Sequence, residues 1–257
     1  RSTLSSSSAA SDVYKGQPQY TDHSNWIRYE GPGIESDKVG YRVYADWRNG
    51  FDIFGKLTPA PTLQVVGQDG YDSYHEMQDW GMDILKVGQS LGAGGFGLWH
   101  DDKLQLVSNL EQHKITILEN GALRSAFAID YQGWQNAENT QDLRATFSMQ
   151  AGSSLVHTRL DFALPIPNIA AGVVKHENTE LITGDVNITG KAYSYIASWG
   201  EQALDGSPLG MAIFFRKEDW QKNTSDDSNY IAVLSPNGHP SPENPDAQQL
   251  PTYFLAV

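Results

Sequence analysis

Short segments in which apolar and polar side chains alternate follow one another along most of the chain. Clear examples are residues 125–131, 143–149, 156–164 and 210–215. Period-two alternation between turn signals is typical of half-buried strands. At least ten such segments are present, and so many strands pack as stacked sheets more readily than as one flat sheet. We therefore expect an all-β fold, a large two-sheet antiparallel sandwich.

The composition supports this expectation and excludes several classes of protein. The 257 residues include 24 Gly, 12 Pro and 39% hydrophobic residues, which suits one turn-rich β domain with its own core. A net charge of −13 argues against a nucleic-acid partner, because Lys and Arg supply most of that binding. Cysteine is absent, so disulfides and thiolate chemistry are excluded. No apolar run reaches about 18 residues, so we expect no membrane-spanning segment.

Both ends of the sequence look unlike the rest. Residues 1–17 are rich in Ser and lack a starting Met. Translated adaptor sequence and a linker left after removal of a signal peptide are both open interpretations. We expect residues 1–17 to lie outside the fold and residues 18–257 to form the domain. Residues 252–257 read as a strand, and we expect the natural chain to continue beyond it.

One segment carries a helix signal. Ser73 and Glu76 have the spacing of a capping box, in which the two side chains satisfy each other's free backbone N–H groups. Met77 and Trp80 would lie on the buried side of the helix. The sequence therefore predicts a short helix near residues 74–80, with His75 on its exposed or site-facing side.

The strand-like run 40–48 separates an apolar face from a polar one. The polar face carries Arg42, Tyr44, Asp46 and Arg48. A guanidinium matches a carboxylate bidentately, so this face suits an anionic, hydroxyl-rich ligand. The alternative is that the two arginines form structural ion pairs with Asp46 or Asp37. On the ligand-binding hypothesis, Asp46 orients the arginines.

The candidates for proton transfer lie in a nearby cluster and in one loop. His75 is the candidate base, because imidazole titrates near neutral pH; a helix-packing histidine is the alternative. Tyr71 or Tyr74 could protonate a leaving oxygen, or act as the base if an arginine lowers its pKa. His176, in a loop after Gly172, is the reserve base.

Aromatic residues on one face of residues 193–199 form a second candidate surface. Tyr195 and Trp199 could stack on sugar rings, but an aromatic core stripe explains them equally well. In residues 156–164, His157, Arg159 and Asp161 occupy the face opposite the apolar side chains. No metal or cofactor motif is present, and we expect neither.

Several segments together resemble a domain-of-unknown-function family from the polysaccharide-degradation gene clusters of marine and gut bacteria. The segments are 29–42, 46–49, 52–56, 67–76 and 79–88, and the likeness extends from about residue 25 to 257. The resemblance implies a fold like that of galactose mutarotases. It also implies a periplasmic or secreted bacterial protein. The oligomeric state stays open.

The family's best-understood members look like dehydratases of ulvan oligosaccharides. They remove water from a non-reducing-end glucuronate or iduronate and leave a 4,5-unsaturated uronate. Such an elimination needs a carboxylate neutraliser, a base and an acid. The resemblance thus implies a carbon–oxygen lyase whose partner is an acidic oligosaccharide. A polysaccharide lyase and a non-catalytic carbohydrate-binding domain are the alternatives.

Overall fold

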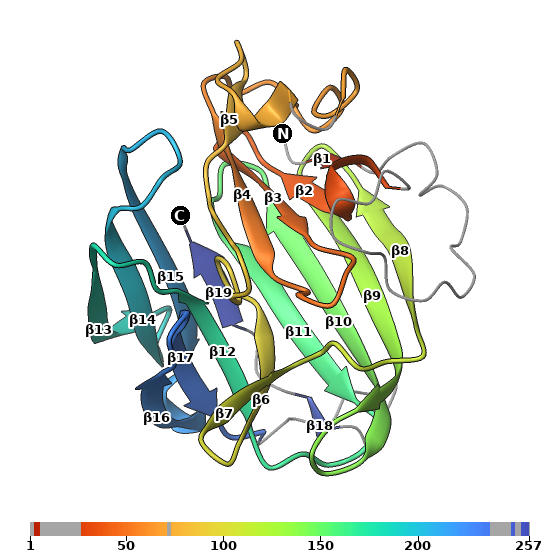
Figure 1. Ribbon diagram of the computed structural model, residues 1–257, viewed down its shortest axis with the longest axis vertical. Coiled ribbons are helices and arrows are strands. Elements are labelled where there is room, and N and C mark those ends of the chain that lie inside the picture. Colours follow the sequence, from red (N-terminus) through yellow and green to blue (C-terminus); the bar gives the residue numbers. More distant parts are fainter. Residues whose placement is uncertain (1–2, 6–26, 71–72, 237–247, 250–252, 257) are drawn as a thin grey trace.

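The computed structural model describes residues 3–5, 27–70, 73–236, 248–249 and 253–256 (Figure 1). Strands make up 56% of it and helices 4%. The prediction of an all-β fold is therefore confirmed. The helical part consists of three single turns of 3-10 helix: η1 (Arg28–Glu30), η2 (Ser73–His75) and η3 (Lys217–Asp219).

The described strands pair into antiparallel sheets of five, nine and five strands. The first sheet contains, in spatial order, β1 (Thr3–Ser5), β2 (Gly33–Glu35), β3 (Val39–Val43), β4 (Phe51–Lys56) and β5 (Gly81–Asp83). The second contains β13 (Thr179–Ile188), β14 (Lys191–Glu201), β15 (Pro208–Arg216), β19 (Tyr253–Ala256), β11 (Val156–Phe162), β10 (Thr140–Gln150), β9 (Arg124–Gln135) and β8 (Gln112–Asn120), with β18 (Gln248–Gln249) beside β11. The third contains β16 (Trp220–Ser225), β17 (Asn229–Leu234), β12 (Ile169–Val174), β6 (Phe96–His100) and β7 (Lys103–Leu106).

The predicted two-sheet sandwich of the galactose-mutarotase type is wrong. The nine-stranded sheet consists of two groups, β13–β15 and β8–β11, joined through the short strand β19. With the other two sheets this makes four small antiparallel groups, the arrangement of a four-bladed β-propeller. Alternation along a strand reveals its two faces but not its partners, which are set by contacts between distant segments.

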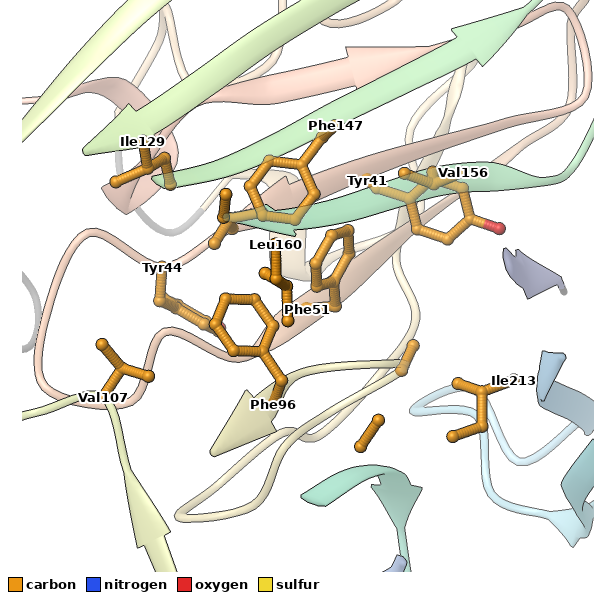
Figure 2. Close-up of a cluster of buried hydrophobic side chains, with 14 of the residues drawn as sticks. Tyr41, Tyr44, Phe51, Phe96, Val107, Ile129, Phe147, Val156, Leu160 and Ile213 are labelled. Atoms are coloured by element: carbon orange, nitrogen blue, oxygen red, sulfur yellow. The ribbon is translucent and has the colours of Figure 1, made fainter. Parts of the chain in front are cut away.

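The main core lies between the strands of the first sheet and those of the nine-stranded sheet. Figure 2 shows Phe51 of β4 pointing toward Phe147 of β10, and their ring centroids are 5.2 Å apart. Leu160 of β11 and Phe96 of β6 belong to the same buried cluster. Because strands from all three sheets share this core, it fixes β3 and β11 relative to one another.

The predicted helix near residues 74–80 is also wrong. Ser73 Oγ donates to Asp69 Oδ1 at 2.5 Å and to the carbonyl of Gly70 at 3.1 Å, so it does not cap a helix. After one 3-10 turn, reciprocal backbone hydrogen bonds between Gln78 and Gly81 turn the chain into β5. Gly81 has φ = 128°, a conformation that favours glycine. Met77, expected on the buried side, is 52% exposed.

Strands formed from the two ends of the sequence are paired within the sheets. Of residues 1–17, which we expected to lie outside the fold, the structure describes Thr3–Ser5; they form β1 and pair with β2. The strand expected within residues 252–257 is β19, which lies between β11 and β15. Among the described residues, no helix has the length and apolar character needed to cross a membrane.

Candidate functional site

Arg42 of β3 lies at the centre of a buried cluster of charges beneath η2. Its side chain is 1% exposed. Nε and one terminal nitrogen donate to Asp52 Oδ2 at 2.9 and 2.5 Å, and the same terminal nitrogen donates to Asp83 Oδ2 at 2.7 Å. The hydroxyl of Tyr44 lies 2.7 Å from that nitrogen and donates to Asp52 Oδ2 at 2.6 Å. The other terminal nitrogen donates to Tyr29 O at 3.2 Å and Tyr74 Oη at 3.3 Å.

This network commits Arg42 to the protein's own acceptors. Breaking a buried, hydrogen-bonded ion pair costs about 3–5 kcal/mol, which a ligand carboxylate would have to offset. Arg42 therefore reads as a structural cation. Its ion-pair partners are Asp52, Asp83 and Glu30, not the Asp46 or Asp37 that the sequence suggested.

Burial and the neighbouring carboxylate of Asp52 raise the pKa of Asp83 well above its usual range, although Arg42 opposes the shift. Burial likewise raises the pKa of Tyr44 and raises that of Tyr74 to about 12. The raised pKa favours the neutral form of Asp83, and that form would lower the negative charge that Arg42 must balance. A tyrosine with a raised pKa is poorly suited to act as a base.

Arg48 follows the alternative considered from the sequence. Its Nε donates to both oxygens of Asp46, at 3.1 and 2.9 Å, and a terminal nitrogen lies 3.4 Å from Glu30 Oε1. The guanidinium carbon lies 3.8 Å from the centre of the Tyr44 ring. Asp46 therefore holds Arg48 in a buried ion pair next to the Arg42 cluster.

His75 is the partly exposed member of this region. Its Nε2 lies 3.7 Å from Asp83 Oδ2, its side chain is 34% exposed, and its ring packs on Tyr74 at 4.4 Å. Tyr71 lies outside the described residues. The structure thus joins Arg42, Tyr44, Tyr74 and His75 around Asp83, with His75 facing outward. His176 lies in the loop that follows β12, and its Nε2 is 3.0 Å from the carbonyl oxygen of Lys86.

A different set of basic side chains lies on the outer face of the nine-stranded sheet. His157 and Arg159 are two residues apart on β11, so they share this face, while Val156, Thr158 and Leu160 pack into the core. His157 pairs with Ser148 of β10. His157 and Arg124 of β9 border a hollow of about 380 Å³, whose lining consists of Arg124, Ser148, Gln150, Ser153, Leu155 and His157, whereas Arg159 lines a different hollow on this face.

Burial and the neighbouring charges favour the neutral form of the His157 imidazole. Burial lowers the pKa of His157, and the charges of Arg124 and Arg159 lower it further. A second hollow of about 320 Å³ adjoins on the same face and contains Arg144, which pairs with Asp130 at 2.7 Å, beside Arg159. A neutral histidine among guanidiniums can accept a proton while the guanidiniums hold an anion.

These arginines differ from Arg42 in how firmly they are held. Arg124 pairs with Glu119, and Arg159 donates to Asp161 Oδ1 at 3.1 and 3.0 Å, with its side chain 40% exposed. Exposed ion pairs contribute about 0–1 kcal/mol. A ligand carboxylate can therefore replace Asp161 or Glu119 at small cost, which makes these guanidiniums the better anion ligands.

The same sheet face continues to the predicted aromatic residues. His157 pairs with position 254 of β19, which pairs with Phe214 of β15. Phe214 in turn pairs with Tyr195 of β14, so these positions lie side by side across four strands. Trp199 lies four residues along β14 on that face and is 51% exposed. Tyr195 and Trp199 therefore share a surface with His157 rather than with His75.

The sequence marked His157 and Arg159 as the polar side of a strand but did not select them. They lie near Arg124 because β9 pairs with β10 and β10 pairs with β11. The alternation of side chains within a single strand does not predict this pairing. The available signal was the alternation itself, which places a histidine and an arginine together on an exposed face. Within the described part of the chain, no group of three His, Asp or Glu side chains is arranged to hold a metal ion.

Comparison with known proteins places the chain in a family. The family model described as "Domain of unknown function (DUF4861)" matches residues 5–241. The chain belongs to the DUF4861 family. Among curated proteins, none matches this DUF4861 chain.

Among solved structures, the DUF4861 chain is similar to an α-galactosidase from Lactobacillus brevis. The TM-score is 0.34 with 10% sequence identity, over 87% of this chain. The match covers 39% of the α-galactosidase, so this chain spans about two fifths of that protein's length.

Proposed function

We propose that this protein is a carbon–oxygen lyase that removes water from the non-reducing-end uronate of an oligosaccharide, and that its active site is the hollow at Arg124 and His157, with Arg159 next to it on β11. The observation that carries the proposal is the placement of His157 and Arg124 around one hollow, with Arg159 two residues from His157 on the same face of β11; both guanidiniums and burial lower the pKa of His157. Elimination beside a carboxylate needs a base that is neutral at neutral pH and cations on the carboxylate. The family resemblance supplies the substrate class.

In the proposed reaction, Arg124 and Arg159 bind the uronate carboxylate and stabilise the charge that develops on it. His157 accepts the C5 proton, and the electron pair of that bond forms the C4–C5 double bond as the C4–O bond breaks. The imidazolium then returns a proton to the departing oxygen, so that water leaves and His157 is neutral again. One histidine therefore serves as base and acid, and atoms and charge balance.

The test uses purified protein and oligosaccharides that end in a saturated uronate. We expect ultraviolet absorbance of the conjugated product together with the mass loss of one water and no shortening of the chain. His157→Gln should abolish turnover, while His100→Gln, at the exposed end of β6, should retain it. Absence of turnover on any uronate-ended substrate would contradict the proposal.

Two further outcomes separate the alternatives. Chain shortening with the same absorbance would identify a polysaccharide lyase, and binding without any product would identify a carbohydrate-binding domain. His75→Gln tests the other location, because His75 is the exposed group beside Asp83. Loss of turnover in His75→Gln together with full turnover in His157→Gln would move the active site to η2.

A further inference from the structure

Two aromatic rings of β14 lie against glycines of the neighbouring strands. Tyr195 pairs with Gly184 of β13, and Trp199 pairs with Gly210 of β15. A methyl group placed on Gly184 would come within 2.6 Å of Tyr195 Oη, and one on Gly210 within 2.9 Å of Trp199 Cε3. Each ring therefore fills the space that a missing side chain leaves on the adjacent strand.

The outward sides of these rings face solvent. Trp199 is half exposed, and the ring of Tyr195 lies tilted by 44° against that of Phe214, with ring centroids 5.6 Å apart. Ile182 and Val186 of β13 are exposed on the same face. This surface is part of the β13–β15 group at one side of the molecule in Figure 1. The core-stripe explanation of Trp199 therefore fails, and an exposed aromatic surface indicates a binding function.

The shape and neighbours of this surface favour a sugar as its occupant. Rings held against a sheet offer broad faces for stacking, whereas a helix or extended peptide needs a groove for its side chains. Charged groups lie at its borders: Arg216 beside the Tyr193 position and Glu180 beside Trp199. They can hydrogen-bond to hydroxyls at the rim of a stacked pyranose. The surface also continues the sheet face that carries His157.

We propose that Tyr195, Phe214 and Trp199 form a stacking surface for uncharged sugar residues of an oligosaccharide whose acidic end occupies the hollow at His157. This inference deepens the proposed function and rests on it for the position of the acidic end. Three strand spacings separate His157 from Tyr195, a distance of about 14 Å at about 4.8 Å per spacing. The ligand therefore crosses the strands, and a single uronate is too short to reach both places.

The test measures binding by calorimetry with two probes: the uronate-ended oligosaccharide, and the same oligosaccharide with its carboxylate reduced to an alcohol. The reduced probe cannot be eliminated and has no carboxylate for Arg124, so it reports stacking alone. Trp199→Ala should weaken its binding roughly fivefold to tenfold, the size expected for one stacked ring. Gly210→Val keeps the indole of Trp199 but displaces it from its position against residue 210, and it should weaken binding of the reduced probe to a similar extent.

Trp47→Ala is the matched control, because Trp47 is an exposed tryptophan that follows β3 of the first sheet. It should bind the reduced probe as the unmodified protein does. Wild-type binding by both Trp199→Ala and Gly210→Val, equal loss in Trp47→Ala, or no binding of the reduced probe would overturn the inference. Binding of the reduced probe without turnover of the uronate-ended one would instead leave stacking intact and contradict the lyase proposal.

Discussion

Two nitrogen atoms of Arg42 donate to a single carboxylate oxygen of Asp52, over 2.9 and 2.5 Å, within the core. Removing the charge of one partner leaves the other charge buried and unpaired. We expect Asp52→Asn to lower the free energy of unfolding by about 3–5 kcal/mol. Urea denaturation at pH 7 measures this loss.

The neighbouring Asp83 provides the matched control for that experiment. Burial and Asp52 raise the pKa of Asp83, which favours its neutral form, and an amide reproduces the charge and the acceptor oxygen of that form. We therefore expect Asp83→Asn to lower the free energy of unfolding by less than Asp52→Asn does. Equal losses in the two variants would contradict a raised pKa at Asp83.

The burial of Arg42 explains why the sequence suggested a ligand-binding arginine where the structure has an arginine in a buried ion-pair network. Alternation correctly placed Tyr41 and Arg42 on opposite faces of β3, with Tyr41 in the main core. It could not show that the second face is also covered, since all five residues of β3 are buried. The cover comes from Tyr74 and Asp83, which lie more than 30 residues along the chain.

At the candidate active site, the sequence predicted the exposed faces of the strands but not which strands lie side by side. Sequence alternation identified the exposed face that carries His157 and Arg159, and proposed Tyr195 and Trp199 for sugar stacking. That these residues share one surface follows from β19, a short strand inserted between β11 and β15. Local periodicity predicts such faces, but the order of strands in a sheet depends on long-range pairing.

A second prediction concerns the pH dependence of turnover. Burial, Arg124 and Arg159 lower the pKa of His157 below the ordinary histidine value near 6.5. The imidazole therefore becomes protonated only at a lower pH than a free histidine does. We expect the acidic limb of kcat/KM to lie below pH 6.5. Arg124→Gln removes one of the charges that lower this pKa, so it should move the limb to higher pH.

Profiles of kcat/KM against pH for both proteins check this expectation, since they report groups of the free enzyme. The shift of the limb distinguishes electrostatic control of His157 from a purely structural role, which would lower activity at every pH alike. An unchanged limb in Arg124→Gln would place the titrating group elsewhere.

A third prediction links His113 of β8 to stability in acid. Burial lowers the pKa of His113 to about 4, with Asp46 opposing the shift. Between about pH 4 and pH 6.5 the unfolded chain binds this proton and the folded protein does not, so the free energy of unfolding falls as the pH is lowered. At 1.36 kcal/mol per pKa unit, the loss from this residue approaches about 3 kcal/mol.

Urea denaturation at pH 7.5 and pH 4.5 measures this effect. His113→Gln, which cannot take up the proton, should lose less stability between the two pH values than the unmodified protein does. A matched substitution at the exposed His100 should leave the difference as it is. A pH dependence in His113→Gln equal to that of the unmodified protein would rule out this cause.

The last prediction follows from the use of one histidine as both base and acid. His157 reaches its substrate from one side, so the C5 hydrogen it removes and the C4 oxygen it protonates must lie on the same face of the sugar ring. They do so in glucuronate and lie on opposite faces in iduronate. We therefore expect a glucuronate-ended oligosaccharide to be turned over at least tenfold faster, which corresponds to about 1.4 kcal/mol in the barrier. Paired assays on the two epimers, with identical sugars behind them, measure the ratio. Faster turnover of the iduronate form would require a second proton donor on the opposite side of the hollow.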